Sequence, residues 1–142
     1  MTRPARERAS VLMLMPAGVL VVLMLGAIAF DLSLLFLRQR QAASLAGDVA
    51  NDLATQAIDE ATFRSTGEYR LDPDRADELG RALVTQSDLA EELVEVEVDV
   101  LADDTVRVTV VLHVDYVFAK SIPGASDGTE VQASATATAQ TG

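Results

Sequence analysis

The stretch ASVLMLMPAGVLVVLMLGAIAFDLSLLFLRQRQAASLAGDVANDLATQAIDEA, residues 9–61, decides the fold of this 142-residue chain. Residues 9–30 contain no charged side chain. A helix needs about 20 predominantly apolar residues to cross the hydrocarbon core of a bilayer. A chain of this size has no core large enough to hide such a helix on all sides. We therefore expect residues 9–37 to form a transmembrane segment.

The charges that flank this segment predict its orientation. Arg3, Arg6 and Arg8 precede it in a basic lead, residues 1–8, and Arg38 and Arg40 follow it. Short flanks with more arginine and lysine stay in the cytoplasm. We therefore expect a single-pass protein of the cell membrane, with a cytoplasmic N-terminus and an extracytoplasmic C-terminal part.

Charge and composition argue against several classes of function. The formal net charge is −11, with +3 on residues 1–40 and −14 on residues 41–142. An acidic exterior part repels nucleic acid and anionic lipid, so we expect no nucleic-acid partner. The chain has no cysteine, which removes disulfides, thiolate catalysis and cysteine-ligated zinc or iron sites.

Beyond Arg40 the sequence keeps a helical pattern. Small and apolar side chains recur at spacings of four, three, four and four residues, at Ala42, Ala46, Val49, Leu53 and Ala57. This spacing places them on one face of a helix, and small side chains let another element approach closely. We expect one helix from about Ser10 to about Ala61, with residues 38–61 as an amphipathic extension. Its stripe packs either on its own domain or on a partner, and the candidate assembly contacts on it are Ala42, Ala46, Val49 and Leu53.

Residues 62–142 predict a small extracytoplasmic α+β domain. A turn at Gly67 precedes a helix over residues 73–86 that Asp72 caps. Asp88 and Glu91 fit a second cap and its back-reaching partner. Alternating polar and apolar side chains predict strands in residues 94–101, 106–118 and 130–140. The expected fold class is α+β: a long N-terminal transmembrane helix continuing into an amphipathic helix, short helices, and a three-stranded antiparallel sheet with one wet face.

No motif in the sequence predicts catalysis. Residues 124–128, GASDG, match the nucleophile elbow G-x-S-x-G, but they lie in a loop between two predicted strands, and the only histidine, His113, precedes them. A position on the solvent-exposed face of a strand accounts for His113, and the start of a helix accounts for the acidic residues that follow Asp72. We predict that the protein is not an enzyme and that it has no cofactor, metal site or small-molecule substrate.

Asp31 follows the uncharged stretch directly. Its carboxylate is either wetted at the outer boundary of the bilayer, or paired inside an assembly with an arginine or the N-terminus of a neighbouring subunit. The residues AIA, 27–29, also fit a signal-peptidase site. Cleavage after Ala29 would release a secreted soluble binding domain, which is the alternative to an anchored protein. The apolar residues LSLLFL, 32–37, favour the uncut anchor.

In its order of parts the chain resembles the TadE/TadG-like pilus-assembly proteins of tight-adherence (Flp) pili. The resemblance rests on residues 6–54, where a basic lead, an apolar helix, an aspartate, an aromatic and leucine patch, an Arg-x-Arg and an alanine-rich stripe follow one another. The loop IPG, 122–124, and the strand VQASATATA, 131–139, are similar to the family's ending. The resemblance implies a minor-pilin-like or pseudopilin-like protein. Its partners would be the lipid bilayer, other pilin subunits and membrane proteins of the assembly platform.

The resemblance also raises the question of processing by a prepilin peptidase. Such processing would want a glycine before the cut and a glutamate at the fifth position after it. Ala9 and Ser10 occupy the candidate junction, and Leu14 stands where the glutamate would be. The chain therefore departs from the family's pattern at both positions, and whether it is processed stays open.

Overall fold

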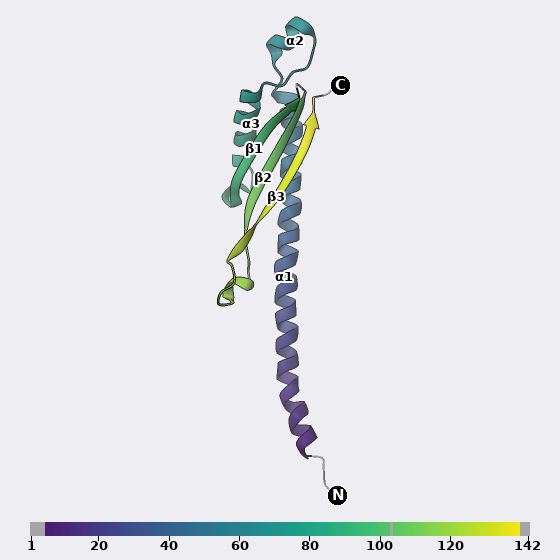
Figure 1. Cartoon of the computed structure of the whole chain (residues 1–142), viewed down its shortest axis with the longest axis vertical. Helices are drawn as coiled ribbons and strands as arrows, with labels where there is room; N and C mark the ends of the chain where they lie inside the picture. The colour runs from purple at the N-terminus through teal and green to yellow at the C-terminus, as the bar shows by residue number, and fades with distance from the viewer. Residues whose placement is uncertain (1–4, 103, 140–142) are drawn as a thin grey trace.

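A computed structural model describes residues 5–102 and 104–139, with side chains from Leu14 onward. A long helix, α1, carries a small α+β domain packed along its C-terminal half (Figure 1). The helix runs from Ala5 to Gln56, and its 52 residues at about 1.5 Å each make a rod of roughly 78 Å. The predicted fold class is confirmed, because short helices and a three-stranded antiparallel sheet follow the long apolar helix.

The helix α1 ends at Gln56, before the predicted end at Ala61. Ile58 leaves the helix and pairs with Leu71 in an isolated antiparallel bridge. Asp59 then accepts hydrogen bonds from the backbone amides of Ala61 and Thr62 and so starts a second helix, α2 (Glu60–Thr66), which was not predicted. A side chain that caps the next helix competes with continuation of the first, which explains the earlier end.

The helix α3 (Pro73–Thr85) confirms the prediction over residues 73–86. Asp72 caps it by accepting hydrogen bonds from the amides of Asp74 and Arg75. The second predicted cap, Asp88 with Glu91, is wrong. A single 3-10 turn, η1 (Ala90–Glu92), forms there without a side-chain cap, because the next strand already begins at Leu93.

The three strands form one antiparallel sheet in the order β1–β2–β3. Their bounds are Leu93–Ala102, Thr105–Asp115 and Gly128–Thr138. The pairing of β2 with β3 is continuous from Thr105, opposite Thr138, to Asp115, opposite Gly128. The pairing of β1 with β2 shifts register near both ends of β1, and Val94 is exposed there instead of facing the core.

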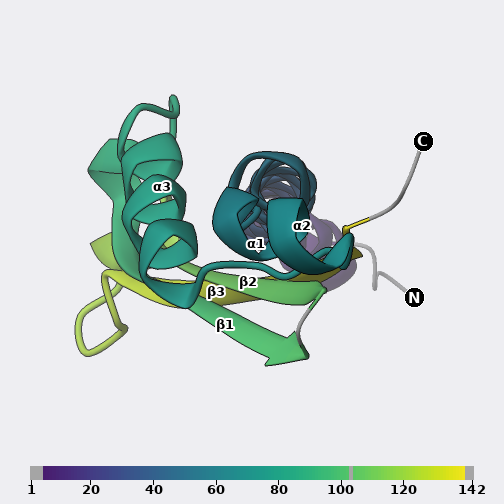
Figure 2. The ribbon, with the colours of Figure 1, turned by 90° about the horizontal axis from the view of Figure 1, so that it is seen from above.

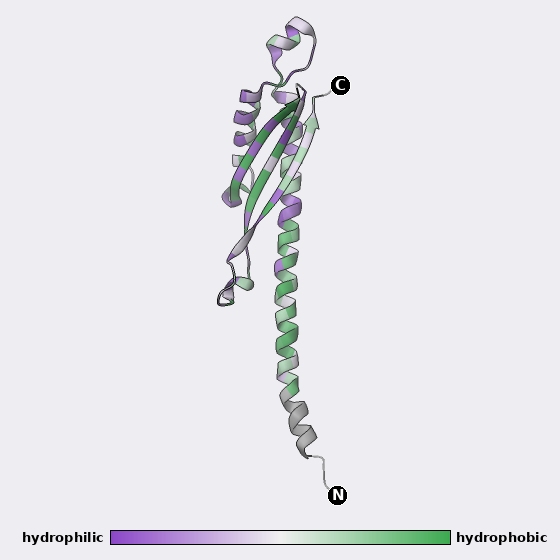
Figure 3. Cartoon of the chain, viewed as in Figure 1, coloured by the Kyte–Doolittle hydropathy of each residue, from purple (hydrophilic) through white to green (hydrophobic). Residues whose placement is uncertain are grey.

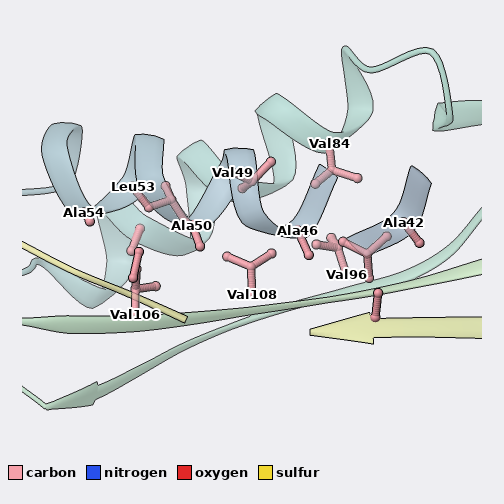
Figure 4. Close-up of a cluster of buried hydrophobic side chains, with 14 of the residues drawn as sticks. Ala42, Ala46, Val49, Ala50, Leu53, Ala54, Val84, Val96, Val106 and Val108 are labelled. Carbon is pink, nitrogen blue, oxygen red and sulfur yellow. The ribbon is translucent and has the colours of Figure 1, made fainter. Parts of the chain in front are cut away.

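One face of the sheet is covered by two helices. Seen from above, α1 and α3 lie side by side on that face (Figure 2), with α1 against β2 and β3 and α3 against β1. Small and branched side chains of α1 point toward the valines of the sheet (Figure 4). Gly80 of α3 permits this close packing, because a Cβ there would stand only 2.7 Å from Val98 Cγ2.

The two halves of α1 have different surroundings. From Leu14 to Phe30 most side chains are exposed and apolar, whereas the C-terminal half buries one face in the domain (Figure 3). Among the described residues, α1 is the one helix that is long and apolar enough to cross a membrane. Its place near the N-terminus fits a membrane span or a signal anchor.

Candidate functional site at the helix–loop junction

Asp31 lies where the exposed half of α1 meets the domain, and it is the one buried carboxylate among the described residues, with 6% of its surface exposed. Its side chain faces the segment that follows β2, namely the β2–β3 loop (residues 116–127). The loop runs beside α1, below the sheet in the view of Figure 1. It contains one 3-10 turn, η2 (Ala119–Ser121).

Both oxygens of the Asp31 carboxylate accept hydrogen bonds from the loop backbone. The amide of Val117 donates to Oδ1 at 2.9 Å, and the amide of Ala119 donates to Oδ2 at 2.9 Å. The amide of Phe118 lies 3.2 Å from each oxygen. One ionised side chain thus satisfies three consecutive amides at the start of η2, and hydrogen bonds to a charged acceptor are stronger than neutral ones.

These bonds also explain why β2 ends early. Residues 116–118 were predicted to continue the strand, yet β2 stops at Asp115. The amides of Val117 and Phe118 turn toward Asp31 and are lost to the sheet. Only Tyr116 still bonds across the loop, donating to the Asp127 carbonyl at 2.8 Å.

Apolar contacts surround the carboxylate. The rings of Phe30 and Phe118 meet edge to face, with centroids 5.5 Å apart and an interplanar angle of 88°, a favourable geometry for aromatic pairs. Beside them lies an apolar cavity of about 350 Å³ between α1 and the loop. We call it the helix–loop groove; its lining is Leu20, Leu23, Met24, Ala27, Ile28, Asp31, Phe118, Ala119 and Ile122.

The structure corrects the interpretation of Asp31 as a wetted boundary residue. The carboxylate is buried and its acceptor sites face backbone amides of its own chain. Pairing with a neighbouring subunit was the other interpretation and stays a prediction. The carboxylate has an intramolecular role in either case, because it joins α1 to the β2–β3 loop.

The stripe of small and apolar side chains on α1 is also buried within the chain's own domain. The candidate assembly contacts are all buried against the chain's own sheet and α3: Ala42, Ala46, Val49 and Leu53. Of the two alternatives that the sequence leaves open, the structure shows packing on the same domain. These side chains form the core of the domain and are buried in the chain itself.

Two polar contacts fix α1 to the domain between Asp31 and the stripe. The guanidinium of Arg38 pairs with the carboxylate of Glu92 at 2.7 Å, with about 30% of each side chain exposed. The Gln39 side-chain amide donates to the backbone carbonyl of Gln132 at 2.6 Å. Both contacts lie about two turns along the helix from Asp31, so the helix is held against η1 and β3 as well as against the loop.

The sequence carries a signal for the role of Asp31, because the stripe that begins at Ala42 continues toward the N-terminus with the same spacing. Counting backward from Ala42 in steps of four, three and four gives Arg38, Leu35 and Asp31. Leu35 is partly buried against the core, so this register continues the packed face of the helix. The periodicity thus places Asp31 on the face that meets the domain, although it does not identify what the carboxylate binds.

The remaining motifs are not assembled into a chemical site. His113 Nε2 lies 3.3 Å from Asp115 Oδ1 on the exposed face of β2. Ser126 is exposed in the β2–β3 loop, which leads into a strand and not into the helix that a nucleophile elbow requires. Over residues 5–102 and 104–139, no group of three or more histidine, aspartate or glutamate side chains could hold a metal ion.

The candidate processing junction, Ala9 and Ser10, lies inside the backbone of α1. No family model, curated protein or solved structure matches the chain. The resemblance to tight-adherence pilus proteins therefore stays a prediction, as does the expectation that the protein is not an enzyme.

Proposed function

We propose that this protein is a membrane-anchored structural subunit of a tight-adherence (Flp-type) pilus or a related secretion apparatus, with the role of a minor pilin or pseudopilin. The observation that supports the proposal best is the division of α1. One half is apolar and exposed, and the other half is a core element of a folded domain in the same unbroken helix.

This division suits a subunit that moves from a bilayer into an assembly. The exposed half requires an apolar environment. Lipid supplies that environment before assembly, and apolar helices of neighbouring subunits supply it afterwards. The hydrophobic core of the domain begins at Leu35 and Ala42 and does not include the exposed half. The anchor can therefore exchange lipid for protein neighbours without unfolding of the domain.

The orientation within the membrane follows from charge. The arginines of residues 1–8 stay in the cytoplasm, and the acidic domain lies outside. Its acidic surface faces pilin subunits and the membrane proteins of the assembly platform. The protein acts by position and contact, and the proposal needs no catalytic residue, cofactor or small-molecule substrate.

Deletion of the gene tests the proposal directly. We expect the deletion strain to lose most of its surface pili in electron micrographs and to regain them with the wild-type chain. The chain has no cysteine, so a single Phe36→Cys substitution adds one reactive thiol on the exposed face of α1. A cross-linker that alkylates this thiol at one end and inserts into any neighbouring side chain on photoactivation at the other should join this variant to another pilus component. Normal pili in the deletion strain, together with no such product, would overturn the proposal.

The secreted alternative makes a different prediction about mass. Cleavage after Ala29 would leave Phe30, Leu32 and Phe36 exposed to water near a new N-terminus. The intact mass of membrane-purified protein should show that residues 10–30 are retained, with the first nine residues present or lost. A mature chain that starts at Phe30 would favour the secreted binding domain over the anchored subunit.

A further inference from the structure

We propose that the β2–β3 loop is a second membrane contact, which places its apolar side chains in lipid beside α1 and is held there by Asp31. The inference rests on the proposed function only in requiring that α1 spans a bilayer. Lipid is the occupant of the helix–loop groove, and the loop and the anchor together form one surface that faces the membrane.

The depth of the loop follows from the length of the anchor. Counted from Ala9, where the uncharged stretch begins, the ~20 residues that cross a hydrocarbon core end near Ile28. Asp31 lies three residues above that level, which is about 4.5 Å along a helix. The groove joins Phe118, Ala119 and Ile122 of the loop to helix residues from Leu20 to Ile28. The apolar part of the loop therefore lies at the boundary of the hydrocarbon.

The side chains on the loop suit this depth. Phe118 and Ile122 are 47% and 58% exposed, and Val117 is exposed beside them. Phe118 and Ile122 line the groove together with exposed apolar side chains of α1, so loop and helix form one continuous apolar patch. A continuous patch of this kind indicates an interaction surface, and its continuity with the anchor favours lipid as the partner that covers it.

The backbone of the loop is also prepared for lipid. A peptide group without a hydrogen-bond partner is costly in a bilayer. Asp31 accepts from the amides of Val117, Phe118 and Ala119. Of the next three amides, two bond within the loop, from Ser121 to the Phe118 carbonyl and from Ile122 to the Ala119 carbonyl, each at 3.0 Å. The apolar segment thus presents side chains to the membrane, with most of its amides already paired.

The charged groups of the loop fit an interfacial position and limit how deep it can go. Lys120 is exposed, and it is the only lysine in the chain. Its four-carbon stem can lie along apolar surface while the ammonium group reaches the headgroups. Asp127 is exposed at the far end of the loop, beside β3. Shallow insertion keeps both charges in water while Phe118 and Ile122 contact acyl chains.

Lipid fits the groove better than a second copy of this chain does. The face of α1 that packs on the domain at Asp31 continues downward through Ala27, Met24 and Leu20 at the same helical spacing. These residues line the groove, so the domain-facing side of the helix passes into the hydrocarbon directly beneath the loop. A neighbouring helix approaching along that side would meet the loop, whereas flexible acyl chains can fill the space under it.

Tryptophan fluorescence tests the proposal, because the chain contains no tryptophan. Single variants Ile122→Trp, Val22→Trp and Leu101→Trp would each be reconstituted, as the full chain, in nanodiscs with one copy per disc and brominated lipids. Val22 is exposed in the anchor, and Leu101 is exposed near the end of β1, where Ala102 pairs with Thr105 at the end of the sheet away from the loop. We expect blue-shifted, quenched emission from Ile122→Trp and Val22→Trp, and unquenched emission from Leu101→Trp.

The outcomes separate the two proposals. Quenching at position 22 without quenching at position 122 would overturn the loop contact and leave the anchor intact. Absence of quenching at both positions would overturn the membrane anchor and the loop contact together. Because each disc holds one copy, quenching of Ile122→Trp cannot arise from a groove filled by a second chain.

The role of Asp31 is tested in the same system. Added to Ile122→Trp, the substitution Asp31→Ala should release the loop and reduce its quenching several-fold, while Asp31→Asn, which keeps one acceptor oxygen, should reduce it less. Asp48→Ala, which removes an exposed aspartate from the same helix, should leave the quenching unchanged. A circular dichroism spectrum with the native sheet signal shows that the domain is folded. Unchanged quenching in a folded Asp31→Ala variant would show that the aspartate does not hold the loop.

Discussion

Replacing Leu53 by alanine should destabilise the domain more than any other truncation on the α1 stripe. Leu53 has no exposed surface and is the largest side chain on that stripe. It packs between the sheet and α3, with its Cδ1 only 3.3 Å from the position that a Cβ on Gly80 would occupy. The sheet and α3 belong to a closely packed core and cannot collapse readily into the space left behind.

The expected loss follows from the volume removed. Truncation of a fully buried leucine to alanine costs about 3 kcal/mol, from lost burial and from the cavity that stays behind. With a urea dependence of about 2 kcal/mol per molar for a domain of this size, the midpoint should fall by about 1.5 M. The measurement is urea unfolding of the full chain in non-ionic detergent, followed by the sheet signal in circular dichroism.

The matched control is Leu37→Ala, which makes the same chemical change on the same helix at a side chain that is 51% exposed. An exposed truncation changes stability by about 0.5 kcal/mol or less, so its midpoint should move little. If both variants unfold at the wild-type midpoint, the stripe does not hold the domain together, and the interpretation of Leu53 as an intramolecular core residue is wrong.

Three further predictions concern the domain. Gly80→Ala should lower stability despite a gain of about 1 kcal/mol in helix propensity, because the new methyl meets Val98 Cγ2 at 2.7 Å, and Val98→Ala should restore the loss in a double-mutant cycle. Asp72→Ala should cost about 1 kcal/mol by removing the cap of α3, whereas Asp74→Ala, at the next acid along the chain, should cost less in the same urea titration. The side chain and the amide of Thr62 donate to Asp59 and lower the pKa of its carboxyl below the ordinary 3.8. The stability that Asp59 adds is therefore present above pH 3.8 and is lost as the pH falls through the lowered pKa. Amide exchange in α2 should become faster over that pH range, and Asp59→Asn should remove this pH dependence.

The long elements could be predicted from sequence because their patterns repeat over many residues. The stripe from Ala42 to Leu53 keeps one helical face for three turns, and the alternation in β2 and β3 keeps one face of the sheet apolar. The predicted ends of the helix α1 and the strand β2 were less accurate. The helix stops at Gln56 because Asp59 caps α2, and the strand stops at Asp115 because Asp31 binds the next amides. In both cases a single side chain competes with a periodic pattern.

The contact between Asp31 and the β2–β3 loop could not be predicted from sequence, for a physical reason. The donors are backbone amides, which every residue except proline possesses, and they lie 86 to 88 positions along the chain from the acceptor. No residue type at positions 117–119 marks them as partners of an aspartate. Only the register of the packed face, continued from Ala42 back to Asp31, indicates that the carboxylate turns inward.

That register also determines how the domain sits relative to the anchor. Asp31, Arg38 and the stripe lie on one face of an unbroken helix, so rotation of the anchor about its own axis rotates the domain with it. A linker between anchor and domain would permit every orientation of the acidic surface. A helix bonded to the loop at Asp31 and to η1 at Arg38 permits one rotational setting, and the loop beneath the sheet limits the tilt. Loss of the Asp31 contact should therefore disturb assembly through misorientation, even in a chain that is folded and inserted.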